Sequence, residues 1–295
     1  MSKILVTGAS GNVGSYVIEA LLDMEAHILA AGTDADKLKK QFASLVERHP
    51  KAVFEVVNFD FTNPQTYAAA LEGVDRIFLM RPPHLGKPED LYPFIEAAKA
   101  KGIKLMSFLS LMGVESNTIP PHHKIEKFIE AQGIPYAHIR PGFFMQNVSG
   151  IHAEEIREND EIFIPAGNSK TSFIDAKDIG LAIATVLHQA ENHKNTAYTI
   201  TGPESLNYHD VAAILSDVTG RPITYAKPGF LRYRHRYIHG RGLDKNYVHV
   251  TMALYLMTRL GTAKAVTHEF QSLTEKEPRT FRAFAEANKK AFIKS

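Results

Sequence analysis

The chain has 295 residues, of which 44% are hydrophobic and 22% charged, enough for one large domain or two associated lobes. The formal net charge of +2 gives no reason to expect a nucleic-acid or anionic-membrane partner, and the absence of cysteine excludes disulfides, thiolate zinc sites and a cysteine nucleophile. Residues 1–25 lack the apolar run of a signal peptide, and no run approaches the roughly 20 apolar residues that span a bilayer. We therefore expect a soluble, cytoplasmic, globular protein.

Three glycines, Gly8, Gly11 and Gly14, follow a short apolar run near the start of the chain. From Val13 onward the apolar residues recur at helical spacing, so the glycines lie in a tight turn between a strand and a helix. Gly8 lets the backbone leave the strand sharply, Gly11 leaves room for a ligand, and Gly14 lets the helix lie close to the strand. The free N–H groups and the dipole at the start of that helix favour a pyrophosphate.

Strands and helices alternate along the first half of the chain. Short apolar runs predict strands at 4–6, 26–31, one ending at 58–60, 76–80, 103–110 and 136–140. Helical patterns separate several of them, at 67–71, 91–101 and 125–132. The alternation predicts an α/β fold of the Rossmann type, with a doubly wound parallel sheet that binds ligands at the carboxyl ends of its strands.

The alternation loosens after Gly150. Short strands are predicted within 161–167 and 171–180, a helix at 176–188, a strand at 197–202, and a helix from a cap at Asn207 to Thr219, closed by Gly220. We predict an NAD(P)-binding domain at 1–150 and a smaller α/β lobe at 151–295 for substrate binding or as a lid. The strand and helix at 172–188 are expected to return to the Rossmann core.

A basic segment at 227–250 holds six Lys or Arg residues, interleaved with Tyr233, Tyr237 and Tyr247. Nucleic-acid sites have this composition, but the segment is isolated in a nearly neutral chain. We favour a helical lid whose basic residues face solvent or an anionic substrate.

The glycine motif "TGASGNVG" differs from G-x-G-x-x-G and resembles the T-G-x-x-G-x-x-G of extended and atypical short-chain dehydrogenase/reductases. The stretches "VDRIFLMRPP", "IRPGFFMQN", "FIDAKDIG" and "EPRTFRAFA" resemble the NmrA-like branch of that superfamily, and the resemblance runs from residue 3 to about residue 285. That branch includes NAD(P)H-dependent quinone and dye reductases and also NAD(P)-binding regulators without catalysis, so the resemblance leaves both possibilities open.

The resemblance implies which residues hold the cofactor. Those expected around the pyrophosphate are Thr7, Gly8, Ser10, Gly11, Asn12, Val13 and Gly14. Those expected along the adenine, ribose and nicotinamide are Asp60, Phe61, Leu79, Met80 and Arg81. At the end of the second strand, Thr33 and Lys37 can hold a 2′-phosphate, which favours NADP over NAD, whereas Asp34 can cap the next helix or bind the 2′-hydroxyl of NAD.

The catalytic Tyr-x-x-x-Lys of core short-chain enzymes is absent. At the equivalent helix His122 stands near the place of the Tyr and Glu126 near that of the Lys, and helical spacing puts both on one face. The two can hold a proton near neutrality or form a surface ion pair. Ser110, at the end of the fifth strand, can orient the substrate or bond its own loop. The adjacent His122 and His123 lack metal spacing, so no metal site is predicted.

Reduction of a quinone or a cationic dye needs no tuned proton donor, because the acceptor is electrophilic and water can protonate the product. Phe143, Phe144 and Met145 can form an apolar slot with Asn147 as a polar handle, or they can pack between lobes. The favoured function is an NAD(P)H-dependent reductase of a small, quinone-like or otherwise conjugated acceptor. A redox-sensing regulator with a protein partner is the alternative, and a nucleoside-sugar epimerase a weaker one. The oligomeric state is left open.

Overall fold

The structure is a computed structural model that describes residues 2–294. The chain groups into two compact units, each built from three segments. Unit 1 comprises Met1–Pro141, Ala176–Ile200 and Glu269–Lys276, and unit 2 comprises Gly142–Asp175, Thr201–His268 and Glu277–Ser295. The cofactor and lid roles expected for 1–150 and 151–295 stay predictions.

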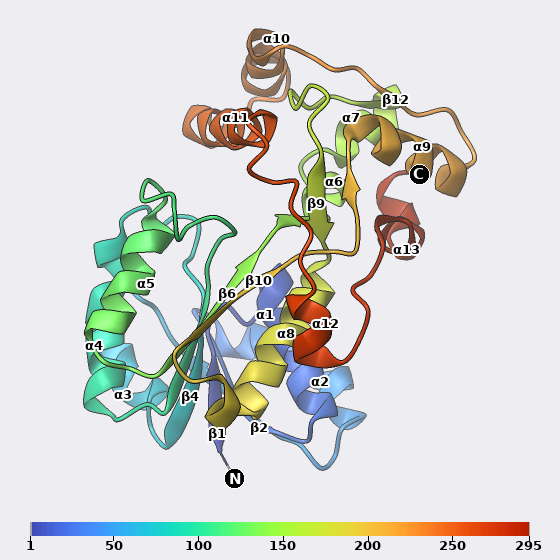
Figure 1. Ribbon diagram of the computed structural model, residues 1–295. Helices are drawn as coiled ribbons and strands as arrows, with labels where there is room; N and C mark the ends of the chain where they lie inside the picture. The colour runs from blue at the N-terminus through green and yellow to red at the C-terminus, as the bar shows by residue number, and fades with distance from the viewer. Residues whose placement is uncertain (1, 295) are drawn as a thin grey trace. The chain divides into compact units, whose positions relative to one another are not determined.

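Unit 1 contains a seven-stranded parallel sheet (Figure 1). In sheet order its strands are β10 (Thr196–Ile200), β6 (Tyr136–Pro141), β5 (Leu105–Leu109), β4 (Val74–Leu79), β1 (Lys3–Val6), β2 (His27–Gly32) and β3 (Val53–Asn58). The central β1 pairs Leu5 with Leu29 on one side and with Ile77 on the other, and all three side chains are buried. The winding reverses between β1 and β4, which confirms the predicted doubly wound fold.

Helices cover both faces of this sheet. They are α1 (Asn12–Asp23), α2 (Ala35–Glu47), α3 (Tyr67–Ala70), α4 (Tyr92–Ala100), α5 (Pro121–Ala131), α8 (Ala176–His188) and α12 (Glu269–Thr274), with short 3₁₀ turns at Pro64–Thr66, Pro88–Leu91 and Ala190–His193. Figure 1 shows α3, α4 and α5 on one face and α1, α2 and α8 on the other. Helix α8 approaches α1 closely at Gly180, where an added Cβ would lie 2.5 Å from the Cβ of Tyr16. The close packing therefore requires glycine at this position.

Two helices of unit 1 differ from expectation. Helix α5 begins at Pro121 rather than at residue 125, since proline suits the first helical position and the turn it opens is polar. Helix α2 has thirteen residues but buries only Leu38 and Phe42, so its apolar stripe is narrow and only its start near Asp34 was expected.

Unit 2 is smaller and richer in short elements. Its strands are β7 (Phe143–Phe144), β8 (Glu161–Ile162), β9 (Thr171–Ile174), β11 (Ser205–Leu206) and β12 (Thr224–Tyr225). Its helices are α6 (Gln146–Ser149), α7 (Ala153–Asn159), α9 (Tyr208–Thr219), α10 (Phe230–His235), α11 (Lys245–Arg259) and α13 (Phe281–Ala287), with a π-helical turn at Arg236–Gly240 and a 3₁₀ turn at Lys289–Ala291. Helix α9 has the expected caps: the Asn207 side chain accepts from the first turn, and Gly220 closes the helix at φ +76°.

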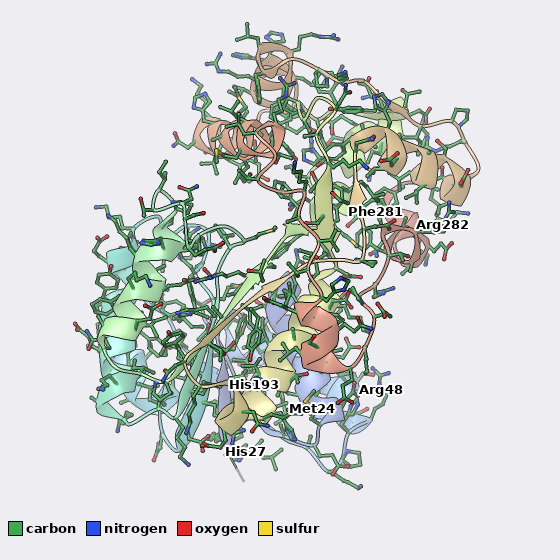
Figure 2. The ribbon with its side chains drawn as sticks, viewed as in Figure 1. Met24, His27, Arg48, His193, Phe281 and Arg282 are labelled. Carbon is green, nitrogen blue, oxygen red and sulfur yellow. The ribbon has the colours of Figure 1, made fainter. Side chains whose placement is uncertain are left out.

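Aromatic side chains dominate the core of unit 2. Figure 2 shows the amphipathic pattern on α13, where Phe281 enters this core while its neighbour Arg282 reaches solvent and binds Asp217 at 2.9 Å. The buried His152 lies between two tyrosines, with Nδ1 2.7 Å from the Tyr237 hydroxyl and Nε2 2.6 Å from that of Tyr255. This core therefore joins apolar packing to a hydrogen-bonded polar network.

None of the helices within residues 2–294 is both long enough and apolar enough to span a membrane.

Candidate functional site

The turn between β1 and α1 is built by its glycines. Gly8 has φ +61°, and the Gly11 N–H donates to the Gly8 carbonyl at 2.9 Å. A Cβ on Gly14 would lie 2.2 Å from that same carbonyl oxygen, so only glycine fits there. The helix begins at Gly11, which has no side chain to cap it, so the N–H groups of the first turn are left for a ligand. The turn fits a dinucleotide pyrophosphate.

Two predicted pyrophosphate residues lie beneath this turn rather than on its surface. Thr7 is fully buried; its hydroxyl donates to the Phe78 carbonyl at 2.9 Å and accepts from the Met80 N–H at 3.0 Å. Val13 is also buried, at 3% exposure. Thr7 thus ties β1 to β4, and this bond also fixes Met80, whose Cε would lie 2.3 Å from a Cβ on Gly8. Ser10, Gly11 and Asn12 form the accessible part of the turn.

At the start of α2, Asp34 has a structural role, whereas Thr33 and Lys37 are accessible to a ligand. The Asp34 carboxylate caps this helix and accepts from the Lys37 N–H at 2.9 Å, which confirms the capping alternative. The side chain of Asn58 accepts from the Ala35 N–H at 2.9 Å and supports the same turn. Thr33 and the Lys37 side chain are exposed, so a hydroxyl and a cation are accessible where a 2′-phosphate is expected.

The residues after β3 and β4 have structural partners as well. Asp60 accepts two hydrogen bonds from Thr62, each 2.8 Å long, which lower its pKa. Phe61 is 7% exposed and packs edge-on against Phe59 and Phe94, with centroids 4.7 and 5.4 Å away. Phe61 and the fully buried Leu79 are therefore core residues, and the Asp60 carboxylate is the polar group at this edge.

Arg81 and His122 act on each other electrostatically. Arg81 is partly buried and folds back to donate to the carbonyls of Pro82 and Leu85, and burial lowers its pKa. Burial, with the positive charge of Arg81, lowers the pKa of His122 to about 4, and Glu126 offsets only part of this. His122 is therefore neutral at physiological pH, and its buried Nδ1 has no hydrogen-bond partner in the described part of the chain.

Glu126 is committed to a different partner. Its carboxylate is 1% exposed and accepts a bidentate pair from Arg140, Nε to Oε1 at 3.0 Å and Nη2 to Oε2 at 2.7 Å. Burial raises its pKa, but Arg140, His138 and Ser110 outweigh this and leave it below the usual value. The helix thus puts His122 and Glu126 on one face as expected, but the Glu126 carboxylate binds Arg140 of β6. The sequence did not predict Arg140 as the partner of Glu126, because the two residues lie on different elements and no local spacing pairs them.

Ser110 lies beside this ion pair. It is 1% exposed, follows β5, and its N–H donates to the Ile139 carbonyl at 2.8 Å. This position supports the loop after the strand, and the Ser110 side chain helps to lower the pKa of Glu126.

Three side chains between α5 and β6 form a metal-like group: Glu126, Glu130 and His138 have ligand atoms within 4.8 Å of one another. Both Glu126 oxygens are bound to Arg140, and Glu130 accepts from Lys127 at 2.7 Å. We interpret the group as an ion network that holds α5 against the sheet, because Arg140 balances the charge of Glu126 and Lys127 balances that of Glu130.

The predicted acceptor residues belong to unit 2, whereas the predicted cofactor and catalytic residues belong to unit 1. Phe143 and Phe144 are half-buried on β7, and the Phe143 ring lies 6.1 Å from that of Tyr255. Met145 is buried in the core of unit 2, and Asn147 is exposed on α6.

The chain was compared with known proteins. The NmrA-like family model matches residues 1–284. The NAD(P)H azoreductase of Xenophilus azovorans is 31% identical over 295 residues, covering 98% of this chain and 99% of the relative. Prestalk A differentiation protein A of Dictyostelium discoideum is 29% identical, covering 96% and 91%. The structure of an NADPH-dependent quinone oxidoreductase from Escherichia coli, complexed with NADPH, has a TM-score of 0.84 at 22% identity, covers 98% and 99% of the two chains, and shows the same fold. The resemblance read from the sequence is confirmed: this chain belongs to the NmrA-like family.

Proposed function

We propose that this protein is an NAD(P)H-dependent reductase that passes hydride to a quinone-like or otherwise conjugated acceptor. One observation carries the proposal: the position of the expected acid holds His122, which burial and Arg81 keep neutral with a pKa of about 4. An imidazole in this state is a poor acid at neutral pH, so the reaction must be one that needs no strong protein acid. Reduction of a conjugated acceptor meets that requirement, and the relative from Xenophilus azovorans is named an NAD(P)H azoreductase.

The proposed cofactor is NADPH, which supplies the hydride when bound. The first-turn N–H groups of α1 hold the pyrophosphate, and Gly11 has no side chain to obstruct it. Thr33 and Lys37 bind the 2′-phosphate; the Asp34 carboxylate, which would repel that phosphate, is engaged with the first turn of α2. NAD remains the second cofactor in this scheme, bound by the same turn without the phosphate contacts.

The proposed acceptor residues supply a surface rather than a proton. Phe143 and Phe144 offer aromatic faces to a planar molecule, and the Asn147 amide offers a hydrogen bond. The Glu126–Arg140 pair holds α5 against the sheet, and His122 near the start of this helix presents an uncharged ring. Water protonates the reduced product.

The direct test is oxidation of NADPH and NADH by the purified protein with quinones, azo dyes and triarylmethane dyes, with cofactor binding measured by calorimetry. Turnover of any of these acceptors supports the proposal. Tight NADPH binding without turnover contradicts it and favours a redox-sensing regulator with a protein partner, a reading supported by the relative named as a differentiation protein. Failure to bind either cofactor contradicts both.

A further inference from the structure

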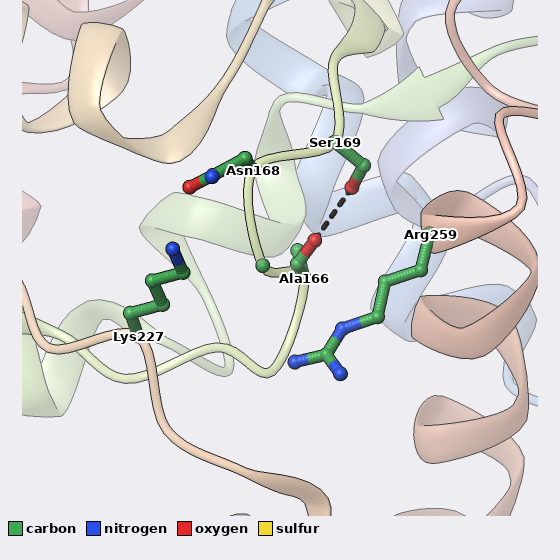
Figure 3. Close-up of a pocket in the computed structure, with 6 residues that line it drawn as sticks. Ala166, Asn168, Ser169, Lys227 and Arg259 are labelled. Carbon is green, nitrogen blue, oxygen red and sulfur yellow. Dashed lines mark hydrogen bonds between the residues drawn. The ribbon is translucent and has the colours of Figure 1, made fainter.

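Unit 2 contains a pocket of about 540 Å³ that the proposed hydride transfer does not use. Its lining residues, shown in Figure 3, are Ala166, Gly167, Asn168, Ser169, Lys227 and Arg259. All six belong to the same unit, although they come from three separate parts of the sequence. Two of them are cations, and no acidic residue lines the pocket.

The floor of the pocket is the turn 166–169. Ser169 closes it, donating its N–H at 3.3 Å and its hydroxyl at 2.7 Å to the Ala166 carbonyl. Gly167 has φ +63°, and a Cβ there would lie 3.3 Å from the Nε of Arg259. The glycine therefore both shapes the turn and allows the guanidinium to lie against it.

Arg259 is held in place by an aromatic ring rather than by a carboxylate. It is the last residue of α11, and its guanidinium carbon lies 4.6 Å from the centroid of the Phe230 ring. Such cation–π contact orients the planar guanidinium but leaves its N–H donors available. Lys227 approaches from the other side of the turn, as Figure 3 shows.

Three other arginines of unit 2 have carboxylate partners, whereas these two cations have none in the part of the chain that the structure describes. Arg221 pairs with Asp160, Arg236 with Glu161, and Arg241 with Glu154 and Glu155. Neither Lys227 nor Arg259 has a carboxylate within ion-pair distance among residues 2–294.

We propose that this pocket binds a small organic anion, a carboxylate, phosphate or sulfonate on an aryl-sized body. The oxyanion lies between Lys227 and Arg259 and takes the paired N–H donors of the guanidinium, while the Asn168 amide adds a neutral hydrogen bond. The pocket is an open depression of about 540 Å³, more than an inorganic ion fills, so an anion held there leaves room for an organic body toward solvent. This site goes beyond the reductase activity and stands or falls independently of it.

The test is calorimetric titration of the full chain with phenyl phosphate, benzenesulfonate and benzoate, and separately with inorganic phosphate, each with and without saturating NADPH. We expect at least one aryl anion to bind more tightly than inorganic phosphate, and NADPH to leave its affinity unchanged. The double variant Lys227→Gln/Arg259→Gln should weaken that binding by about tenfold or more, since hydrogen bonds to charged groups are lost. Circular dichroism of each variant checks that the fold is kept.

The matched control is Lys170→Gln, which removes one positive charge from an exposed residue next to the turn that does not line the pocket. Its affinity for the aryl anions should stay within about twofold of the parent, because Lys170 does not line the pocket and an exposed charge acts only weakly through water. An equal loss in Lys170→Gln and in the single variant Arg259→Gln would overturn the site. Binding of no probe, or equal affinity for inorganic phosphate and every aryl anion, would overturn the assignment to an organic anion, and competition by NADPH would overturn a separate site.

Discussion

The glycine turn and the start of α5 are two places in unit 1 to which the sequence assigns chemistry, and different parts of the chain build them. The turn is made of backbone: its shape follows from Gly8, Gly11 and Gly14, and its ligand groups are amide N–H groups. The start of α5 is made of side chains, and the behaviour of His122 and Glu126 depends on Arg81 and Arg140. A backbone site can thus be deduced from local spacing, whereas a side-chain site cannot be understood until its partners are known.

The largest effect is expected from Gly11→Asp, which breaks the backbone site. The new carboxylate would lie where the pyrophosphate binds, so we expect the affinity for NADPH to fall more than about 100-fold through charge repulsion and lost amide contacts. The fold should persist, because aspartate is a good helix N-cap and Gly11 has an ordinary extended backbone at φ −80°.

Gly86→Asp is the matched control for this change. Gly86 is exposed, and a Cβ there would meet nothing within 4 Å, so calorimetry should show unchanged cofactor affinity. Full NADPH binding by Gly11→Asp would remove the glycine turn from the cofactor site.

Next in size is Arg140→Met, which breaks the side-chain site. It leaves the Glu126 carboxylate buried without its bidentate partner, a change that costs about 3–5 kcal/mol of unfolding free energy in comparable buried pairs. The loss should diminish as the pH falls below the ordinary pKa of Glu126, because a protonated carboxyl no longer needs the cation. Urea unfolding at pH 7 and at pH 4 measures both; a cost below about 1 kcal/mol at pH 7 would show that water reaches this carboxylate.

A smaller effect is expected from Thr33→Asp, which tests a predicted side-chain contact to the 2′-phosphate on the adenosine ribose of the cofactor. Loss of a charge-assisted contact and gain of a repulsion should cost about 2 kcal/mol with NADPH, or roughly 30-fold in Kd, and far less with NADH. The titration of both cofactors against the same variant is the measurement. Equal weakening of the two would assign Thr33 no part in binding the 2′-phosphate.

The smallest effect is expected from His122→Ala. A general acid contributes about 10²–10⁴-fold, but His122 is already neutral at pH 7, so kcat should fall less than about tenfold. With a pKa of about 4, His122 does not titrate near neutrality, and kcat of the parent should be flat from about pH 6 to pH 8. A larger loss, with a rate that declines as the pH rises through this range, would make His122 the proton donor and reopen carbonyl reduction.

Local signals account for what the sequence predicted well. The glycine turn, the Asn207 cap and the Gly220 stop of α9 each depend on residues within one or two turns, and the structure has all three. The alternation of strand and helix patterns predicted the parallel fold. It did not predict that β10 would lie at the sheet edge beside β6.

The remainder depends on contacts between distant parts of the chain. No residue near Glu126 in the sequence predicts that Arg140 will bind its carboxylate. The stretch "NFDF" does not predict that the Phe61 side chain will be buried in the core. The pocket of unit 2 is the extreme case, since Lys227 and Arg259 meet the turn 166–169 only after folding. The residue types show which interactions a side chain can make, and tertiary packing determines which of these interactions form.

The segmented course of the chain has a consequence for biosynthesis. Helix α8 packs on α1, with Gly180 against Tyr16, and strand β10 completes the sheet beside β6, yet both are translated after the first segment of unit 2. A nascent chain released or truncated near residue 150 would expose the α1 surface that α8 covers and an unpaired edge on β6. Unit 1 therefore cannot be completed before the first segment of unit 2 has been synthesised, and we expect fragments that end near residue 150 to depend on chaperones or to aggregate.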